Sequence, residues 1–226
     1  EFDRILTRAG AQGLNATTTN EATIYFVELP ANRTQLWFVL EADRMANPVF
    51  REFYSERDVV TEERRMRVET SPGGLLYEQH LAAAYTIHPY GVPVVGYMSD
   101  LETLSRADVA DYYRRFYGPA NAVVTIVGDV DPDQVFGWAR TYLGTQPRGG
   151  GAAPVLAVEP PQRGERRIEV VWDAEPQVRI GWHTPDIFHE DAPALTLLST
   201  LLSGGRTSRL YQRLVVEDRL ATEVFT

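Results

Sequence analysis

One stretch of the chain cannot form a regular element, and it divides the sequence in two. Residues 145–165 are rich in proline and glycine, including Gly149-Gly150-Gly151 and Pro160-Pro161. Such a composition is typical of a linker, because glycine adds backbone freedom and proline removes a hydrogen-bond donor. We therefore expect one domain to occupy residues 1–144 and a second to begin at residue 166 and continue to residue 226.

On both sides of this linker, helical and strand patterns alternate without a regular βαβ rhythm. This mixture predicts an α+β fold in which helices cover mixed β-sheets. Apolar spacing and capping residues predict helices over residues 1–9, 34–45, 48–69, 72–85, 105–116, 131–143, 192–202 and 208–217. β-Rich runs predict strands over 14–20, 22–29, 122–127, 168–172, 178–183 and from 221 onward, the first two forming an antiparallel pair.

Composition excludes several classes of function. The 226 residues carry a net charge of −9 and no cysteine, so catalytic chemistry has to come from histidines, carboxylates or hydroxyls. No basic run could neutralise phosphates, so we expect no nucleic-acid partner. No uncharged apolar run reaches about 18 residues, so we expect no membrane span. The lack of cysteine suits an exported protein, and a periplasmic location is weighed slightly above a cytoplasmic one.

The charged segment 48–69 places two carboxylates on a stripe of apolar residues. Val49, Phe53, Glu56, Val60 and Glu63 follow one another at spacings of four, three, four and three, which keeps them on one helix face. We expect this face to point into the core. A buried carboxylate is costly unless it has a cation, a donor or a raised pKa.

Spacing alone leaves two interpretations of these carboxylates open. Seven residues make nearly two turns, so the Cα atoms of Glu56 and Glu63 lie roughly 10 Å apart on nearly the same bearing. They cannot readily both bind one metal ion, so one would be a ligand and the other would support it or face a substrate. In the structural interpretation, which spacing alone favours, Arg67 pairs with Glu63 four residues earlier and Glu56 meets a distant arginine.

Several segments resemble one family. Residues 55–66 read SERDVVTEERRM and resemble the third-ligand helix of the insulinase/pitrilysin metallopeptidases, inverted zincins with a His-x-x-Glu-His motif, which include the mitochondrial processing peptidase and its bacterial relatives. Further resemblances follow in the family's order, and together they cover nearly the whole chain. These segments are EFDRILTRAGAQGLNATTTNEATIYF, HPYGVPVVG, RRFYGPANAVVTIVGDVDP and LLSGGRTSRLYQRL.

The resemblance implies a zinc-dependent metalloendopeptidase that cleaves extended peptides. It implies that Glu63 is the third zinc ligand and that Glu56 is the supporting catalytic carboxylate. Asn15, Ala16 and Thr17 would lie on an edge strand that pairs with the substrate backbone. The fold would comprise two homologous units, with the third-ligand helix and edge strand in the first and a non-catalytic second unit.

The remaining zinc-binding motif does not occur in this sequence. The histidines are His80, His88, His183 and His189, and none forms His-x-x-Glu-His. The chain alone therefore cannot build a three-ligand zinc site. The family spacing would place the motif roughly a dozen residues before Glu1, so we expect the chain to be a fragment of a longer protein.

A second departure concerns substrate contacts. The family usually carries an Arg and a Tyr seven residues apart late in its second domain, where this chain has Val215 and Thr222. Neither side chain donates hydrogen bonds as Arg and Tyr do. In some bacterial members a partner subunit supplies the pair, so the resemblance implies a zinc-bearing subunit of a homo- or heterodimer. The alternative is a non-catalytic homologous scaffold or partner subunit that binds peptides or other subunits without hydrolysis.

Overall fold

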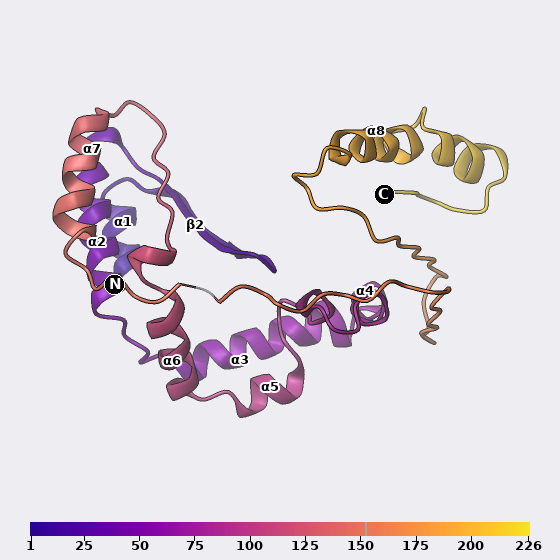
Figure 1. The fold of residues 1–226 in the computed structure, drawn as a ribbon, viewed down its shortest axis with the longest axis horizontal. Coiled ribbons are helices and arrows are strands. Elements are labelled where there is room, and N and C mark those ends of the chain that lie inside the picture. The colour runs from indigo at the N-terminus through magenta and orange to yellow at the C-terminus, as the bar shows by residue number, and fades with distance from the viewer. Residues whose placement is uncertain (152) are drawn as a thin grey trace. The chain divides into compact units, whose positions relative to one another are not determined.

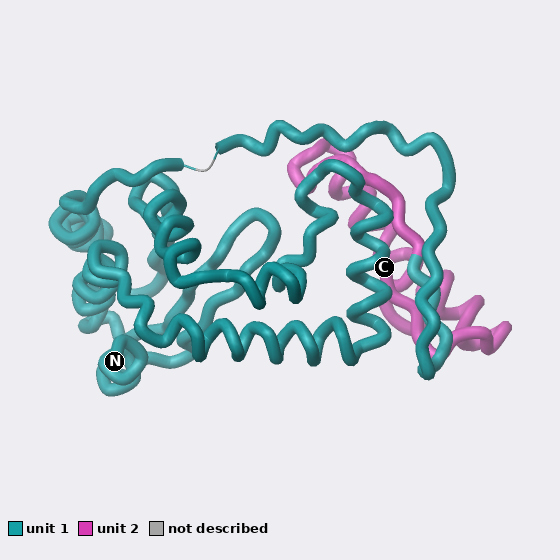
Figure 2. The backbone as a smooth tube through the Cα atoms, turned by 90° about the horizontal axis from the view of Figure 1, so that it is seen from below, with its two compact units in different colours: residues 1–179 teal, residues 180–226 magenta. Residues whose placement is uncertain are grey.

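The computed structural model describes residues 1–151 and 153–226, and its elements are mostly helices with one small sheet (Figure 1). This confirms the predicted α+β class. The chain forms two compact units, Glu1–Arg179 and Ile180–Thr226 (Figure 2). Compactness does not test the predicted domain division at residues 145–165, which stays a prediction.

The first unit contains most of the regular elements. Its helices are α1 (Phe2–Arg8), α2 (Thr34–Ala46), α3 (Phe53–Arg64), α4 (Pro72–Ala84), α5 (Met98–Thr103), α6 (Arg106–Phe116) and α7 (Pro132–Trp138). Its strands are β1 (Gln12–Thr18) and β2 (Thr23–Glu28). π-Helical turns extend α3 over Arg65–Glu69 and α7 over Ala139–Leu143, and single 3-10 turns lie at Ala31–Arg33, Pro89–Gly91 and Pro119–Asn121. The second unit contains α8 (Ala192–Ser203) and a π-helical segment, Tyr211–Glu217.

The predicted antiparallel pair is confirmed as the β1–β2 hairpin. Ala16 lies opposite Tyr25 and Thr18 opposite Thr23. The register shifts between Gln12 and Asn15, where Gly13 has a φ of +61°, a conformation that glycine adopts without strain. In the described part of the chain β1 pairs with β2 alone, so its other edge is open.

The other strand predictions were wrong for this chain. Residues 122–127, 168–172, 178–183 and those after 221 are neither helix nor strand. Their β-type composition is real, but a strand exists only when a neighbouring strand takes its backbone hydrogen bonds. No such neighbour lies among the described residues, and Val123, for example, is 95% exposed.

The start of α3 also differs from the prediction. We expected Pro48 to open the helix, but the chain turns after Asn47 and α3 begins only at Phe53. The ring of Phe50 lies 5.8 Å from that of Tyr113 on α6 in an edge-to-face arrangement. This aromatic contact holds the segment before α3 out of the helical path, so tertiary packing overrides the local helix-start signal.

Two predicted helix starts are confirmed by their caps. Ser105 and Asp108 form a capping box at the start of α6, because each side chain accepts a hydrogen bond from the other residue's backbone N–H. Asp131 accepts hydrogen bonds from the N–H groups of residues 133 and 134 at the start of α7, where Pro132 occupies the first helical position.

Glu159, in the irregular segment that begins at residue 153, is held by the loop that follows α4. Its carboxylate accepts hydrogen bonds from the Thr86 hydroxyl at 2.7 Å and from the backbone N–H groups of Thr86, Ile87 and His88 at 2.9, 2.9 and 3.1 Å. Arg166 donates to the carbonyl oxygens of residues 83 and 84 at the end of α4. These contacts fix the path of the segment along the first unit.

The Glu159 contacts predict a pH-dependent contribution to stability. The Thr86 hydroxyl and backbone, followed by the N–H groups of Ile87 and His88, lower the pKa of Glu159 to about 2 from its usual 4.5. A lowered pKa stabilises the folded state above pH 4.5, and this contribution disappears as the pH falls from 4.5 towards 2.

In urea unfolding, Glu159→Gln should therefore lower the midpoint at neutral pH, and the difference from wild type should narrow below pH 4.5. Glu165→Gln, an exposed control in the same segment, should match wild type throughout. A difference for Glu159→Gln that does not change with pH would contradict this account.

Candidate functional site

Glu56 and Glu63 both lie on α3, and the structure places them on the same side of that helix. A seven-residue step is about 20° short of two full turns, so the two side chains share one bearing. Glu56 is exposed, and the Glu63 side chain is 38% exposed. The face that carries them is therefore accessible in the described part of the chain.

Glu63 pairs with Arg67 in the way that the structural interpretation of the sequence predicts. A guanidinium nitrogen of Arg67 lies 2.8 Å from the Glu63 carboxylate, four residues earlier on the helix. The Arg67 side chain is 73% exposed, so solvent screens the pair and its contribution to stability is small, roughly 0.3–0.5 kcal/mol. An exposed arginine of this kind could leave the carboxylate at little cost.

The expectation that the Glu56 and Glu63 stripe faces the core was wrong. The buried residues of this helix and its π-helical turn are Arg64 and Val68, and Arg57 is partly buried on the same side. Arg57 and Arg64 lie one residue after the two glutamates, a rotation of about 100° on a helix. The sequence pattern misassigned the inward face because it followed the apolar spacing and placed neither arginine, whereas Arg64 is buried and Arg57 is partly buried, each with partners of its own.

Arg64 joins three parts of the first unit. Its guanidinium donates two hydrogen bonds to the Glu78 carboxylate of α4, at 2.8 and 3.2 Å, and one to the carbonyl oxygen of Gly96, at 2.7 Å. Arg64 is 6% exposed and Glu78 is 8% exposed. The hydrogen bond to Glu78 raises the pKa of Arg64, so the guanidinium remains charged over the working range of pH.

One buried nitrogen of Arg64 lacks a hydrogen bond. Its Nε atom lies 3.5 Å from a Glu69 carboxylate oxygen, close enough for electrostatic attraction but without hydrogen-bond geometry. We regard this contact as an ion pair only, because Nε–H direction decides whether a hydrogen bond forms. The strong contacts of Arg64 are therefore those to Glu78 and Gly96.

Arg57 makes a second, looser connection seven residues earlier. One of its guanidinium nitrogens lies 3.4 Å from the carbonyl oxygens of both Glu102 and Leu104, at the end of α5. Figure 1 shows α5 alongside α3, with α4 at the far end of α3. Reasoning from sequence missed both arginines. The signal was present as two Glu-Arg dipeptides, at 56–57 and 63–64, seven residues apart.

The predicted substrate-binding residues lie on β1, on a separate element from the two glutamates. Asn15, Ala16 and Thr17 are all exposed. The Ala16 N–H donates to the side-chain oxygen of Asn15 at 2.8 Å, so Asn15 is the acceptor for a backbone N–H of its own strand. No hydrogen bond or ion pair in the described part of the chain joins these residues to Glu56 or Glu63.

The described residues do not by themselves form a metal site. No group of three His, Asp or Glu side chains among them could hold an ion. Glu63 offers one accessible carboxylate, which fits a single oxygen ligand of zinc and no more. His88 fixes the loop after α4, since its Nδ1 accepts a hydrogen bond from the Tyr90 N–H at 3.2 Å. Burial and the nearby Arg179 lower the pKa of His80.

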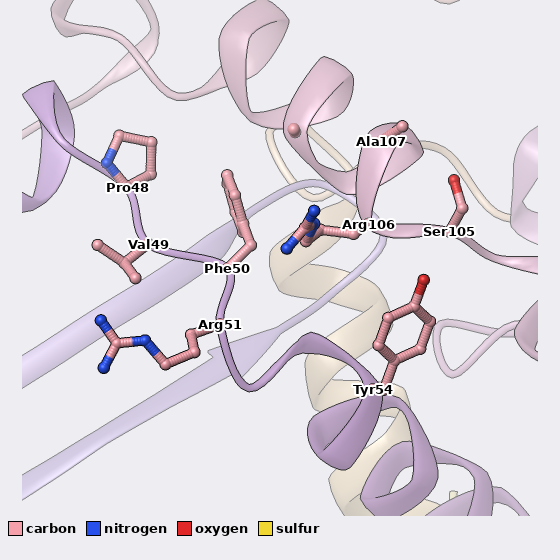
Figure 3. Close-up of a pocket in the computed structure, with 9 residues that line it drawn as sticks. Pro48, Val49, Phe50, Arg51, Tyr54, Ser105, Arg106 and Ala107 are labelled. Atoms are coloured by element: carbon pink, nitrogen blue, oxygen red, sulfur yellow. The ribbon is translucent and has the colours of Figure 1, made fainter.

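An open pocket of about 720 Å³ lies where α3 and α6 begin (Figure 3). Phe50, Tyr54 and Ala107 are among its lining residues, together with the arginines Arg51 and Arg106. It contains neither Glu56 nor Glu63. In the described part of the chain no helix is both long and apolar enough to cross a bilayer.

Comparison with protein families identifies the class of protein that carries this helix and hairpin. The profile of the insulinase family, peptidase family M16, matches residues 1–97. The profile of the peptidase M16 inactive domain matches residues 103–226. The chain therefore belongs to peptidase family M16.

Individual relatives agree with this assignment. The zinc protease PqqE of Helicobacter pylori is 34% identical over 233 residues, covering 100% of this chain and 52% of the relative. An uncharacterized zinc protease of Mycobacterium tuberculosis is 33% identical, covering 94% of this chain and 50% of the relative. The chain thus spans about half the length of the curated relatives it matches.

Solved structures agree on the fold. The crystal structure of a protease from Helicobacter pylori superposes with a TM-score of 0.85 at 33% identity, over 100% of this chain and 56% of that one. A peptidase M16 inactive domain from Pseudomonas fluorescens superposes with a TM-score of 0.78 at 18% identity, over 99% of this chain and 55% of that one. The second likeness concerns the fold alone.

Proposed function

We propose that the protein containing this chain is a zinc-dependent endopeptidase that acts on extended peptides, and that Glu63 is its carboxylate zinc ligand. The observation that carries this proposal is the shared, accessible face of α3 on which Glu56 and Glu63 lie, while Arg64 next to it is buried and Arg57 is partly buried. The names of the relatives, which are zinc proteases, support it.

The residues of this chain have limited, specific parts in that activity. Glu63 would leave its exposed partner Arg67 and offer a carboxylate oxygen to the metal, and Glu56 would orient neighbouring groups from one heptad earlier. Zinc, when bound, lowers the pKa of a bound water and polarises the scissile carbonyl. The other ligands and the general base would come from parts of the protein outside this chain.

β1 would hold the substrate. Its open edge can pair with an extended peptide through backbone hydrogen bonds, which give affinity with little dependence on sequence. The Ala16 N–H is the donor best placed for this, because its present acceptor is only the neighbouring side chain of Asn15. Asn15 would then turn from the strand to the peptide.

Replacement of Glu63 tests the metal-ligand role. In the full-length protein, Glu63→Gln should weaken zinc binding at least about 100-fold and abolish peptide cleavage, because an amide is a much poorer zinc ligand than a carboxylate. Glu62→Gln is the matched control, since Glu62 is adjacent, exposed and paired with Arg65. Zinc stoichiometry and cleavage of a fluorogenic peptide are the measurements. Equal zinc binding by wild type and Glu63→Gln would contradict the proposal.

The same assay decides between the enzyme and the alternative, a non-catalytic homologous subunit. The match of residues 103–226 to the family's inactive domain gives that alternative its support, together with Val215 and Thr222 in place of Arg and Tyr. We expect a zinc-bearing protein whose cleavage rises when a homologous partner subunit is added. A protein that binds no zinc and stays inactive with the partner would establish the scaffold function. Full activity of the protein without the partner would show that the partner is not needed.

Replacement of Asn15 tests the substrate strand. Asn15→Ala should lower kcat/KM for peptides about 2–10-fold, the worth of one ordinary hydrogen bond, without changing zinc content. Asn20→Ala, at the turn of the same hairpin, should leave kcat/KM unchanged. An equal effect of the two substitutions would place the substrate elsewhere.

A further inference from the structure

We infer that Arg57 and Arg64 are positioning residues, which set the rotation of α3 about its own axis and thereby hold Glu56 and Glu63 on its accessible face. This inference rests on the proposed function, because it assigns to the arginines the orientation of the proposed metal ligand. It adds residues to the site that touch neither metal nor substrate. Glu78 contributes to the same positioning, because its carboxylate accepts hydrogen bonds from Arg64.

The sequence order couples each arginine to one glutamate. Arg57 directly follows Glu56, and Arg64 directly follows Glu63. Neighbouring residues on a helix differ by about 100° in bearing. When an arginine points into the protein, the glutamate before it therefore points about 100° away from that direction. A rigid helix cannot turn one of the pair without turning the other.

The Arg64 contact fixes this bearing firmly. Both nitrogens of the guanidinium fork bind the carboxylate of Glu78, and this planar, two-point geometry tolerates little rotation. The third acceptor, the Gly96 carbonyl oxygen, belongs to the loop before α5. Arg64 therefore ties α3 to two other elements, and its burial keeps water from replacing these partners.

The start of α4 packs closely against the turn after α3. A Cβ atom added at Gly74 would overlap the carbonyl oxygen of Arg67 in the π-helical turn. At the adjacent Gly73 the nearest atom to such a Cβ is a side-chain oxygen of Gln177 at 3.4 Å, an ordinary contact. The backbones of α4 and the turn after α3 are thus in close contact beside the ion pair.

Arg57 supplies the second point of attachment. Two contacts about 10 Å apart along a helix restrain its tilt as well as its rotation. Arg57 holds α3 to the end of α5 through backbone carbonyl oxygens, which are acceptors that substitution of side chains cannot remove. The face with Glu56 and Glu63 needs no contact of its own to keep its direction.

A purely structural ion pair is the competing explanation, and the chain offers a matched control for it. Glu41 on α2 is 7% exposed, and its carboxylate accepts two hydrogen bonds from Arg44, at 3.0 and 2.5 Å. Glu41 therefore resembles Glu78 in burial and in the type of its partner. Arg44 lies on the same helix, however, and its guanidinium lies over the rings of Phe2 and Tyr25, so this pair makes no contact that would orient α3.

The experiment compares Glu78→Gln, Glu41→Gln and Glu63→Gln in the full-length protein. The measurements are the melting temperature, the zinc dissociation constant against a competing chelator, and the visible absorption of the Co²⁺-substituted protein, which reports ligand geometry. All binding is measured well below each variant's melting temperature. A contact that only stabilises the fold changes the melting temperature without changing the Co²⁺ spectrum of the folded protein.

We expect Glu78→Gln to weaken zinc binding about 10–100-fold and to change the Co²⁺ spectrum, as loss of a residue that orients a ligand does. Glu41→Gln should lower the melting temperature while zinc binding stays within about twofold of wild type. Equal zinc binding by Glu78→Gln and Glu41→Gln would overturn the inference. If Glu63→Gln weakens zinc binding and Glu78→Gln does not, the inference alone fails. If Glu63→Gln has no effect, the proposed function fails with it.

Arg57→Gln keeps the inference testable if Glu78→Gln does not fold. Arg57 is less buried and its acceptors are backbone oxygens, so its replacement leaves no buried charge. We expect a severalfold weaker zinc binding and a changed Co²⁺ spectrum in a folded protein. A Co²⁺ spectrum and zinc affinity identical to those of wild type would overturn the inference.

Discussion

The buried ion pair between Arg64 and Glu78 is the contact on which the arrangement around α3 depends. Charges this deeply buried are costly to desolvate, and the pair offsets that cost only through its two-point geometry and the additional bond to Gly96. Removal of one partner leaves an uncompensated charge, at a cost of about 3–5 kcal/mol. The pair therefore tolerates little variation in the relative placement of α3, α4 and the loop before α5.

What the sequence predicted well was local. The caps at Ser105 and Asp131, the β1–β2 hairpin and the Glu63–Arg67 pair all depend on residues of one short stretch of sequence. The strand predictions around Val123 and Val171 failed because strands need partners distant in the sequence. The prediction of the inward face of α3 failed for a related reason. Arg64 is buried because a carboxylate distant in the sequence, that of Glu78, pairs with it.

The candidate site divides between what this chain contains and what it lacks. Under the proposed function the chain would contribute one carboxylate ligand, a supporting carboxylate and an open strand edge, and the described residues contain no three-ligand cluster. The chain belongs to peptidase family M16, and its curated relatives are about twice as long. The residues that orient α3, the helix with the proposed ligand, all belong to this chain.

The most direct test of this account is a crystal structure of the full-length protein with zinc bound, with the metal located by anomalous scattering. The account predicts a Glu63 oxygen about 2.0–2.2 Å from zinc, Arg67 no longer paired with Glu63, and the Arg64–Glu78 pair unchanged. Zinc bound elsewhere, with Glu63 still paired to Arg67, would contradict it.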